Sequence, residues 1–292
     1  MDNLMIKRTD GDQKNFDKNW NDRKETVYNH WAKHNPVNQV QLAFSSHWEV
    51  FSQFLADHST NKGKVLEVGS GRGSLSSYFS QDGWDCTLLD SSPKVLEVAK
   101  LIYEKNGHSG TFILGDANSL PFDNDLFDVV FSIGLLEHFE DVSHVISEQI
   151  RVLRPNGRFF AYIIPERGDN IQKYFNWFNN FLKKIVKNFH PESNKVKEKA
   201  EIYRNTYNSS HYNSIMTKLG CTSLTDFGMY PLPMISHSPE FPFSLMNNRV
   251  ELLLTRIFQF VLSLRKFYSG RHGWICSEKM GQAFLVTCRK IN

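Results

Sequence analysis

Short aliphatic runs alternate with longer amphipathic stretches between residues 64 and 165, and this succession predicts an α/β fold. Each run is rich in Val, Ile, Leu and Phe, and polar or helix-like sequence separates it from the next. Strands that alternate with helices form parallel βαβ units, so the pattern predicts a doubly wound sheet. The predicted strands are residues 65–68, 84–90, 111–117, 127–132 and 158–164.

The sequence on either side of this region has a different pattern. Residues 1–25 are polar and predict a mobile arm. Residues 26–62 contain two helix-like stretches, and the second repeats apolar positions at three- and four-residue steps, as in Phe44, Trp48 and Phe51. We expect these residues to form a helical N-terminal lid.

Residues 63–292 are then expected to form one domain with helical insertions at about 168–208 and 234–275. Beyond residue 165 the pattern predicts an aromatic, basic amphipathic helix and two further helices, one of them capped by residues 209–211. It also predicts a sixth strand and a closing strand. These elements are the helices at 171–190, 212–219 and 249–268 and the strands at 222–230 and 282–289.

Three glycines at alternate positions follow the first predicted strand. Gly69, Gly71 and Gly73 lead directly into a plausible helix that begins near residue 74. A strand that turns through glycines into a helix brings backbone N–H groups close to a ligand. A glycine pattern alone is weak evidence, because plain tight turns share it.

The ends of the next strands strengthen this hypothesis. Asp90 follows the glycine turn by about twenty residues, where an acid can accept hydrogen bonds from a ribose diol. Asp116 ends the third strand, and Ser132 and Gly134 end the fourth. Parallel strands end at one edge of a sheet, so these polar residues are predicted to form one binding site.

Residues 60–165 resemble class I S-adenosylmethionine-dependent methyltransferases, of the broad small-molecule type that includes ubiquinone and menaquinone methyltransferases. The resemblance is specific for fold and cofactor but says little about substrate. Glu67 departs from the commoner Asp, and Ser70 stands where Cys or Ala is frequent. The matching segments are Val-Leu-Glu-Val-Gly-Ser-Gly-Arg-Gly at 65–73, Leu-Leu-Asp at 88–90, Gly-Asp-Ala at 115–117, Phe-Asp-Val-Val-Phe at 127–131, Leu-Glu-His at 136–138 and Leu-Arg-Pro-Asn-Gly at 153–157.

This resemblance implies a Rossmann-like, doubly wound sheet of seven strands, mostly parallel with an antiparallel last strand. It also implies S-adenosyl-L-methionine as cofactor and S-adenosyl-L-homocysteine as product. Tyr28 and Trp31 are candidates to touch the cofactor from the lid, with a purely structural role as the alternative. The residues expected to bind the cofactor are Tyr28, Glu67, Gly69, Ser70, Gly71, Asp90, Ser91, Asp116, Ala117, Ser132 and Gly134.

Methyl transfer needs a base only if the nucleophile still carries its proton. His138 follows the fourth strand and can titrate near neutrality, which makes it the candidate catalytic base. The alternative is that Glu137 and His138 begin a helix and hold the loop. Glu166 and His211 are weaker candidates for the base.

The acceptor is not specified by the sequence. Ser-Ile-Gly-Leu follows the fourth strand in place of the Asn/Asp-Pro-Pro-Tyr/Phe of base-amino methyltransferases, and there is no Pro-Cys nucleophile. A small, apolar or planar acceptor methylated on oxygen, nitrogen or carbon is the leading hypothesis. The alternatives are a non-catalytic S-adenosylmethionine-binding module, a membrane-surface enzyme acting on a lipid or quinone, and a relative that binds another nucleoside.

Composition narrows the partners and the compartment. The net charge of +3 lacks the basic excess of a nucleic-acid surface, so no nucleic acid is expected. The four cysteines are widely separated without a Cys-x-x-Cys pair, and no metal is expected. The N-terminal residues lack the apolar core of a secretory signal, so a cytoplasmic location is expected.

The apolar helix at 249–268 has three interpretations. Its polar residues Glu251, Thr255, Gln259 and Ser263 fall four apart and form one narrow stripe. The segment is too short and too charged to cross a bilayer, which needs about 20 mostly apolar residues. It is a buried cap over the site, a contact in a homodimer, or a surface that contacts a membrane. The helix at 171–190, with lysines beside aromatics, favours peripheral membrane contact.

Overall fold

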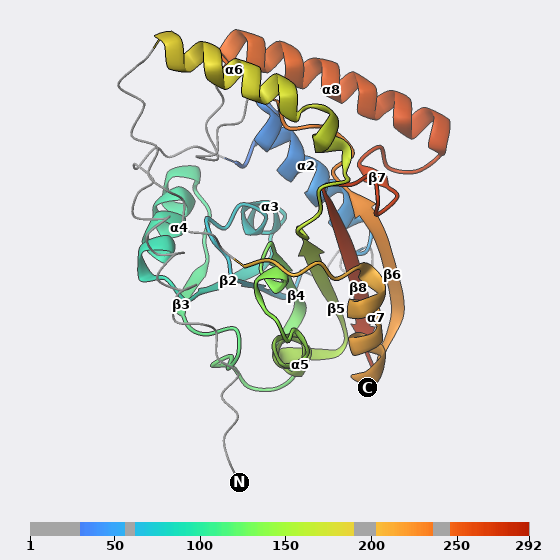
Figure 1. Cartoon of the computed structure of the whole chain (residues 1–292). Coiled ribbons are helices and arrows are strands. Elements are labelled where there is room, and N and C mark those ends of the chain that lie inside the picture. The colour runs from blue at the N-terminus through green and yellow to red at the C-terminus, as the bar shows by residue number, and fades with distance from the viewer. Residues whose placement is uncertain (1–29, 56–61, 190–202, 236–245, 292) are drawn as a thin grey trace.

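One mixed sheet of eight strands, with helices on both faces, forms the centre of the protein (Figure 1). The computed structural model describes residues 30–55, 62–189, 203–235 and 246–291. The strand order is β3-β2-β1-β4-β5-β8-β6-β7. The strands are β1 (Lys64–Val68), β2 (Asp85–Asp90), β3 (Thr111–Leu114), β4 (Phe127–Ile133), β5 (Leu153–Ile163), β6 (Cys221–Met229), β7 (Ile275–Cys276) and β8 (Ala283–Lys290).

The predicted doubly wound arrangement is confirmed. Strands β1 to β5 pair in parallel, and β8 enters antiparallel between β5 and β6. The sheet has one strand more than the seven expected, because the two-residue strand β7 pairs with the end of β6. Two residues are too few to produce the alternating pattern by which a strand is found in a sequence.

Hydrophobic side chains project from both faces of the central strands, which explains why these strands are apolar at almost every position. Phe159 and Ala161 belong to the core on one face, whereas Phe160 and Tyr162 belong to the core on the other. Successive side chains of a strand point to opposite faces, so a sheet covered on both sides needs continuous apolar runs.

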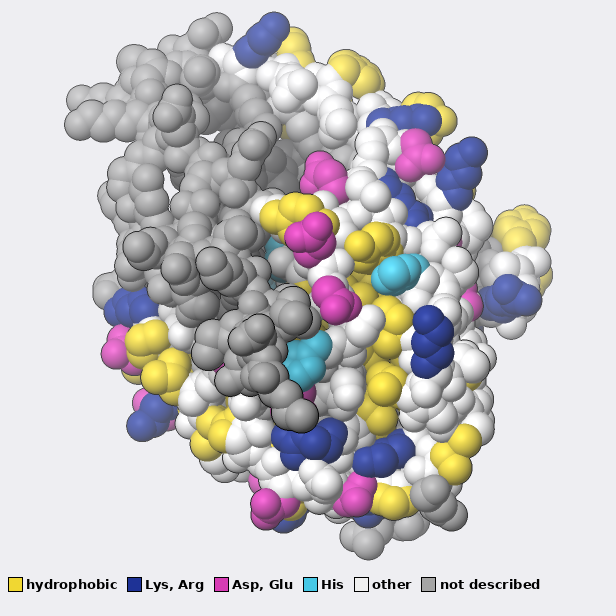
Figure 2. Space-filling model, turned by 60° about the horizontal axis from the view of Figure 1, so that its bottom comes forward, with side chains coloured by type: hydrophobic (Ala, Val, Ile, Leu, Met, Phe, Trp, Pro, Cys, Tyr) yellow, Lys and Arg dark blue, Asp and Glu magenta, His cyan; other side chains and the backbone are white. Residues whose placement is uncertain are grey.

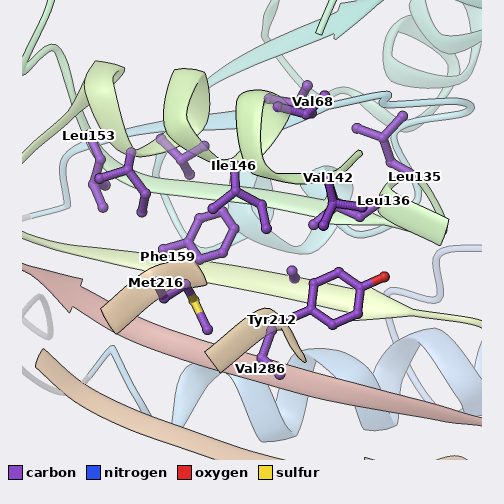
Figure 3. Packing of buried hydrophobic residues seen from close by; sticks show 14 of the residues in the cluster. Val68, Leu135, Leu136, Val142, Ile146, Leu153, Phe159, Tyr212, Met216 and Val286 are labelled. Carbon is purple, nitrogen blue, oxygen red and sulfur yellow. The ribbon is translucent and has the colours of Figure 1, made fainter. Parts of the chain in front are cut away.

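Helices cover the two faces. The first core packs beneath α5 and α7, and Figure 3 shows Ile146 and Met216 beside Phe159, with Tyr212 further along the same core. The second core packs beneath α2, α3, α4 and α8. The helices are α2 (Gln39–Ser52), α3 (Ser76–Gln81), α4 (Pro93–Asn106), η2 (Leu136–His138), α5 (Ser143–Val152), η3 (Ile171–Tyr174), α6 (Asn176–Phe189), α7 (Ser209–Lys218) and α8 (Asn248–Ser269).

Aromatic stacking joins α2 and α3 to the sheet on this second face. The ring of Phe51 in α2 stacks on Phe160 at a centroid distance of 4.4 Å. Phe79 in α3 stacks on Phe131 at 5.0 Å. All four rings are buried, so the helix that follows the glycine turn is held firmly against β4.

Two local features bear on the predictions from the sequence. The second of the two stretches predicted before the sheet is helix α2, whereas most of the first lies outside the described residues, and residues 30–38 contain no helix. Helix α7 is capped by Asn208, whose side chain accepts a hydrogen bond from the N–H of His211, and residues 209–211 already belong to the helix. Asn is among the residues preferred at the N-cap of a helix, because its side-chain oxygen can accept from a backbone N–H of the first turn.

His47 joins α2 to the loop before β7. Its Nδ1 accepts a hydrogen bond of 2.9 Å from the indole N–H of Trp274, and its ring lies 4.5 Å from that of Tyr162. Burial lowers the pKa of His47 to about 3, because a charged imidazolium has no water in this position. Within the described residues, no helix is both long enough and apolar enough to cross a membrane.

Because His47 is neutral in the folded chain and takes a proton when unfolded, the chain should lose stability in acid. Between about pH 6.5 and pH 3, the free energy of unfolding should fall by about 1.4 kcal/mol per pH unit on account of this residue. Denaturant unfolding of wild type and His47→Gln across this range checks it, since Gln can accept the same hydrogen bond. Parallel curves for the two proteins would contradict the assignment.

Candidate cofactor site

The glycine turn after β1 lies against the end of β2. The backbone N–H groups of Gly69 and Ser70 both donate to the carbonyl oxygen of Leu89, at 2.9 and 3.0 Å. Gly69, Gly71 and Gly73 all have positive φ angles, of 69°, 53° and 65°. This left-handed conformation strains any residue with a Cβ atom, so the alternating glycines are required by the path of the backbone.

Asp90 fixes the turn from the end of β2. One carboxylate oxygen accepts from the N–H of Gly71 at 3.0 Å, and the other accepts from the N–H of Ser92 at 3.0 Å. The carboxylate therefore sits between two loops at the rim of the sheet. A carboxylate can accept about four hydrogen bonds, so holding the loops does not by itself exhaust its capacity for a ligand hydroxyl.

Glu67 lies beneath the turn rather than on its surface. It is 3% exposed, and its carboxylate accepts a hydrogen bond from the hydroxyl of Ser76 in α3. Burial raises the pKa of Glu67 to about 8, and the charge of Asp90 adds to the rise. Glu67 thus ties the first strand to the helix that follows the glycine turn.

The turn also contains a buried polar atom without a partner. The hydroxyl of Ser70 is buried and has no hydrogen-bond partner among the described residues. Such an atom loses the hydrogen bond that it makes with water, which is unfavourable unless a ligand restores it. Ser70 is therefore a candidate contact for a polar ligand at this turn.

Asp116 and Ala117 follow β3. One oxygen of Asp116 accepts from the N–H of Asn118 at 2.9 Å and from its side-chain amide at 3.0 Å. Asp116 is exposed and Ala117 is buried. The carboxylate shapes a tight turn here and does not cap a helix, which leaves its exposed side toward the solvent.

The end of β4 contributes Ser132 and Gly134. Ser132 is buried, and the N–H of Gly134 donates to the carbonyl oxygen of Tyr162 at 2.9 Å. Gly134 has a φ of 63°, and a Cβ atom there would lie 3.4 Å from the carboxylate of Glu137. Ser91, the remaining predicted residue, lies half-buried directly after β2.

Glu137 is the residue at this rim whose burial could not be foreseen from the sequence. It is fully buried, and neither carboxyl oxygen has a hydrogen-bond partner among the described residues. Burial raises the pKa of Glu137 to about 7, opposed by the nearby backbone N–H groups of Glu137 and Ile164 and the charge of Arg204. Groups with a pKa near neutrality suit proton transfer.

His138 lies beside this carboxyl group. Its Nε2 is 4.0 Å from Oε1 of Glu137, and its Nδ1 is 2.7 Å from the carbonyl oxygen of Tyr203. Since a carbonyl oxygen only accepts, Nδ1 carries a proton and Nε2 is the basic nitrogen of the neutral ring. Both residues belong to the three-residue helix η2.

The other residues proposed from the sequence make contacts with neighbouring elements of the fold. Trp31 donates from its indole to Gln81 at the last turn of α3, and its ring meets His108. His211 in α7 stacks on Tyr207, which precedes this helix, and the N–H of Glu166 donates to the carbonyl oxygen of Asn205. Tyr28 lies outside the described residues. Among the described residues, no group of three His, Cys, Asp or Glu side chains could hold a metal ion.

Residues 66–161, from β1 to β5, match the family described as "Methyltransferase domain". This segment of the chain is similar to the methyltransferase domains of that family. The match begins in β1 and ends in β5, so it includes all four strand ends described above. The fold and the family together imply S-adenosylmethionine as the cofactor of this methyltransferase domain.

Named relatives share this methyltransferase domain. A 2-methyl-6-phytyl-1,4-hydroquinone methyltransferase of Oryza sativa subsp. japonica is 35% identical over 153 residues, which are 45% of this chain and 42% of that protein. A demethylmenaquinone methyltransferase of Chlorobaculum tepidum is 30% identical over 155 residues, or 50% of this chain and 62% of that protein. The chain spans about half the length of the curated relatives it matches.

A solved structure shows the same fold. The YcgJ protein of Bacillus subtilis superimposes with a TM-score of 0.51 at 18% identity, covering 84% of this chain and 99% of that one. Because the two sequences are only 18% identical, this structural similarity shows the fold alone. The residues of this chain nevertheless fit the implied cofactor, because the turn offers an unpartnered buried hydroxyl at Ser70 and a backbone free of Cβ atoms at Gly69 and Gly71.

Replacing Asp90 by Asn should weaken binding of S-adenosylhomocysteine by about tenfold or more, because a hydrogen bond to a charged acceptor is worth about 1.5–3 kcal/mol. Calorimetric titration measures the affinity. Asp85→Asn at the exposed start of the same strand is the matched control and should bind as wild type does. Equal affinity of all three proteins would remove Asp90 from the site.

Proposed function

We propose that this chain transfers a methyl group from S-adenosylmethionine to an oxygen, nitrogen or carbon atom of a small, apolar or planar acceptor. The observation that carries the proposal is the convergence of four strand ends of the methyltransferase domain at one edge of the sheet. The cofactor supplies a methyl carbon already activated by a positive sulfur. The task of the protein is to hold donor and acceptor in line, and such positioning can contribute about 7–11 kcal/mol.

Each strand end has a proposed part in holding the cofactor. Gly69 and Gly71 pass beneath the methionine and sugar portions, and Glu67 holds the turn and accepts from the amino group. Asp90 accepts from the ribose hydroxyls, with Ser91 beside the adenine. The hydrogen-bond pattern of Asp90 supports this part, since its carboxylate already faces the turn through Gly71.

The ends of β3 and β4 are proposed to bind the adenine and the methionine portions of the cofactor. Asp116 accepts from the adenine amino group, and the N–H of Ala117 donates to a ring nitrogen. Ser132 and Gly134 border the methionine portion. The exposed carboxylate of Asp116 supports its part, as does the positive φ of Gly134, which keeps this stretch of backbone open.

An aromatic group beside the rim supports an apolar, planar acceptor. Strand β6 runs in the same direction as β5, because both pair antiparallel with β8, so Tyr230 directly after β6 lies at the same edge. Its half-buried ring stacks on Trp274 at 4.7 Å and lies 6.3 Å from His47. Two relatives are methyltransferases named for a phytyl hydroquinone and for demethylmenaquinone, which are planar rings on apolar chains.

For an acceptor hydroxyl, the proposed base is Nε2 of His138. The proton leaves the hydroxyl for Nε2, and the carboxylate of Glu137 at 4.0 Å offsets the positive charge that the imidazole gains. The hydrogen bond between Nδ1 and the carbonyl oxygen of Tyr203 fixes the ring, with Nε2 on the side of the Glu137 carboxyl group. Glu137 is then a positioning residue that acts through His138.

Radiolabelled methyl transfer tests the activity directly. Purified protein, labelled S-adenosylmethionine and a panel of hydroquinones and substituted phenols should give label in the organic phase. Asp90→Asn is the matched control, because it weakens cofactor binding while leaving the acceptor side intact. Calorimetric binding of S-adenosylhomocysteine without transfer to the panel or to a cell extract would indicate a non-catalytic binding module.

His138→Ala should lower turnover of a hydroxyl acceptor by about a hundredfold or more, with the affinity for S-adenosylhomocysteine unchanged. Glu137→Gln should lower it less, and should remove the rise in activity through about pH 7 that follows ionisation of Glu137 in wild type. His211→Ala serves as control. Full turnover of His138→Ala would exclude the base role.

A further inference from the structure

Two surface helices carry large hydrophobic side chains on the side that faces the solvent. In the part of the chain that the structure describes, most of the large exposed hydrophobic residues belong to η3, α6 and α8. Isolated apolar residues on a surface are ordinary, but contiguous patches mark interaction sites.

Helix α8 has one apolar side exposed, whereas the first half of its polar stripe is buried beside Phe258. Glu251 and Thr255 are buried, at 4% and 0% exposure. The opposite side repeats at three- and four-residue steps and is open to the solvent. Its members are Leu253 at 62%, Ile257 at 48%, Phe260 at 64%, Leu264 at 40% and Phe267 at 80% exposure. A surface helix of a globular protein normally has the reverse arrangement.

Helix α6 repeats this arrangement. Trp177 is 69% exposed and Phe181 is 53% exposed, and Tyr174 in η3 continues the same side at 62%. Asn179, in contrast, is buried, and its amide donates to the carbonyl oxygen of Met234 at 2.8 Å. Asn179 therefore lies on the side that holds α6 to the protein, together with the half-buried Phe178 and Leu182.

Hydrogen bonds place both helices at the same end of the molecule, above α2 (Figure 1). Asn179 bonds to Met234, and the neighbouring Ile235 donates to the side chain of Gln39 at the start of α2. The amide of Gln39 in turn donates to the buried carboxylate of Glu251 in α8, at 3.2 Å. One chain of polar contacts thus holds the two helices at this end.

The exposed charges of these helices are of one sign. Helix α6 contains no acid in its sequence, and the single acid of α8 is the buried Glu251. Lys184, Arg249, Arg256 and Lys266 are exposed. On the face drawn in Figure 2, by contrast, acidic and basic side chains lie interspersed.

We propose that this apolar-basic surface docks onto the surface of a membrane that contains anionic lipids. The surface consists of the exposed residues Tyr174, Trp177, Phe181, Lys184, Arg249, Leu253, Arg256, Ile257, Phe260, Leu264, Lys266 and Phe267. The aromatic and aliphatic side chains enter the boundary between headgroups and acyl chains, and the basic side chains meet the lipid phosphates. A second copy of this chain fits the surface less well, because it would bring basic residues against basic residues.

This docking surface goes beyond the proposed function and does not need it, because neither the cofactor nor an acceptor takes part in lipid binding. If both proposals hold, an apolar acceptor reaches the rim from the bilayer on which the protein sits. Failure of methyl transfer would leave vesicle binding intact, so the two proposals fail separately.

Sedimentation with vesicles tests the docking surface. The full chain should bind vesicles of phosphatidylcholine mixed with phosphatidylglycerol more tightly than vesicles of phosphatidylcholine alone, and added salt should weaken the binding. Removing the basic charge with Arg256→Gln or Lys266→Gln should lower the partition coefficient by about fivefold for each residue. Phe260→Ser and Phe267→Ser should each lower it by about tenfold or more.

Leu101→Ser is the matched control, because Leu101 is 58% exposed on α4, outside the docking surface. It should bind vesicles as wild type does. Retained S-adenosylhomocysteine binding by the helix variants shows that they are folded, and the two charge variants leave the apolar contacts untouched. Equal binding to both vesicle types overturns the proposal. So does a concentration-dependent dimer in sedimentation equilibrium that Phe260→Ser dissociates, when vesicles recruit neither protein.

Discussion

Three hydrogen bonds between the glycine turn and the end of β2 stabilise the edge of the sheet at which the candidate cofactor site lies. Gly69 and Ser70 donate to Leu89, and Gly71 donates to the side chain of Asp90. These bonds hold the turn against the end of β2, and the helix that follows the turn, α3, packs against β4. A turn with this path needs left-handed backbone angles, which only glycine adopts without strain. The positions of the other residues at the rim depend on this turn.

The central sheet is predictable from the sequence because both of its faces are covered. Residues such as Val129 and Val130 are buried on opposite faces, which makes the whole run apolar and easy to recognise. The orientation of α8, in contrast, cannot be predicted from the sequence. The four-residue spacing of Glu251 and Thr255 shows that the helix has two sides, but hydrophobic periodicity assigns the apolar side to a core. Only the structure shows that Glu251 and Thr255 face inward, where Glu251 accepts a hydrogen bond from Gln39.

For the site, residue type and position after a strand suffice to find Gly69, Asp90 and Gly134. Their neighbours are set by tertiary contacts that leave no local pattern. Glu137 stands in Leu-Glu-His like any exposed helix-starting acid, yet it is fully buried beneath a segment some 65 residues further along, where the N–H of Asn205 donates to its carbonyl oxygen. The shifted pKa follows from that long-range contact, and a single sequence contains no trace of it.

The contact between Gln39 and Glu251 also sets a limit on how far the chain can be shortened from its beginning. The backbone N–H and the side-chain amide of Gln39 both donate to this buried carboxylate, across 212 positions. A version trimmed to begin after α2 would remove the two donors of Gln39 from this buried carboxylate, which is unfavourable. Residues before the sheet are therefore an integral part of the folding unit, and a trimmed version should begin before Asn38, the cap of α2.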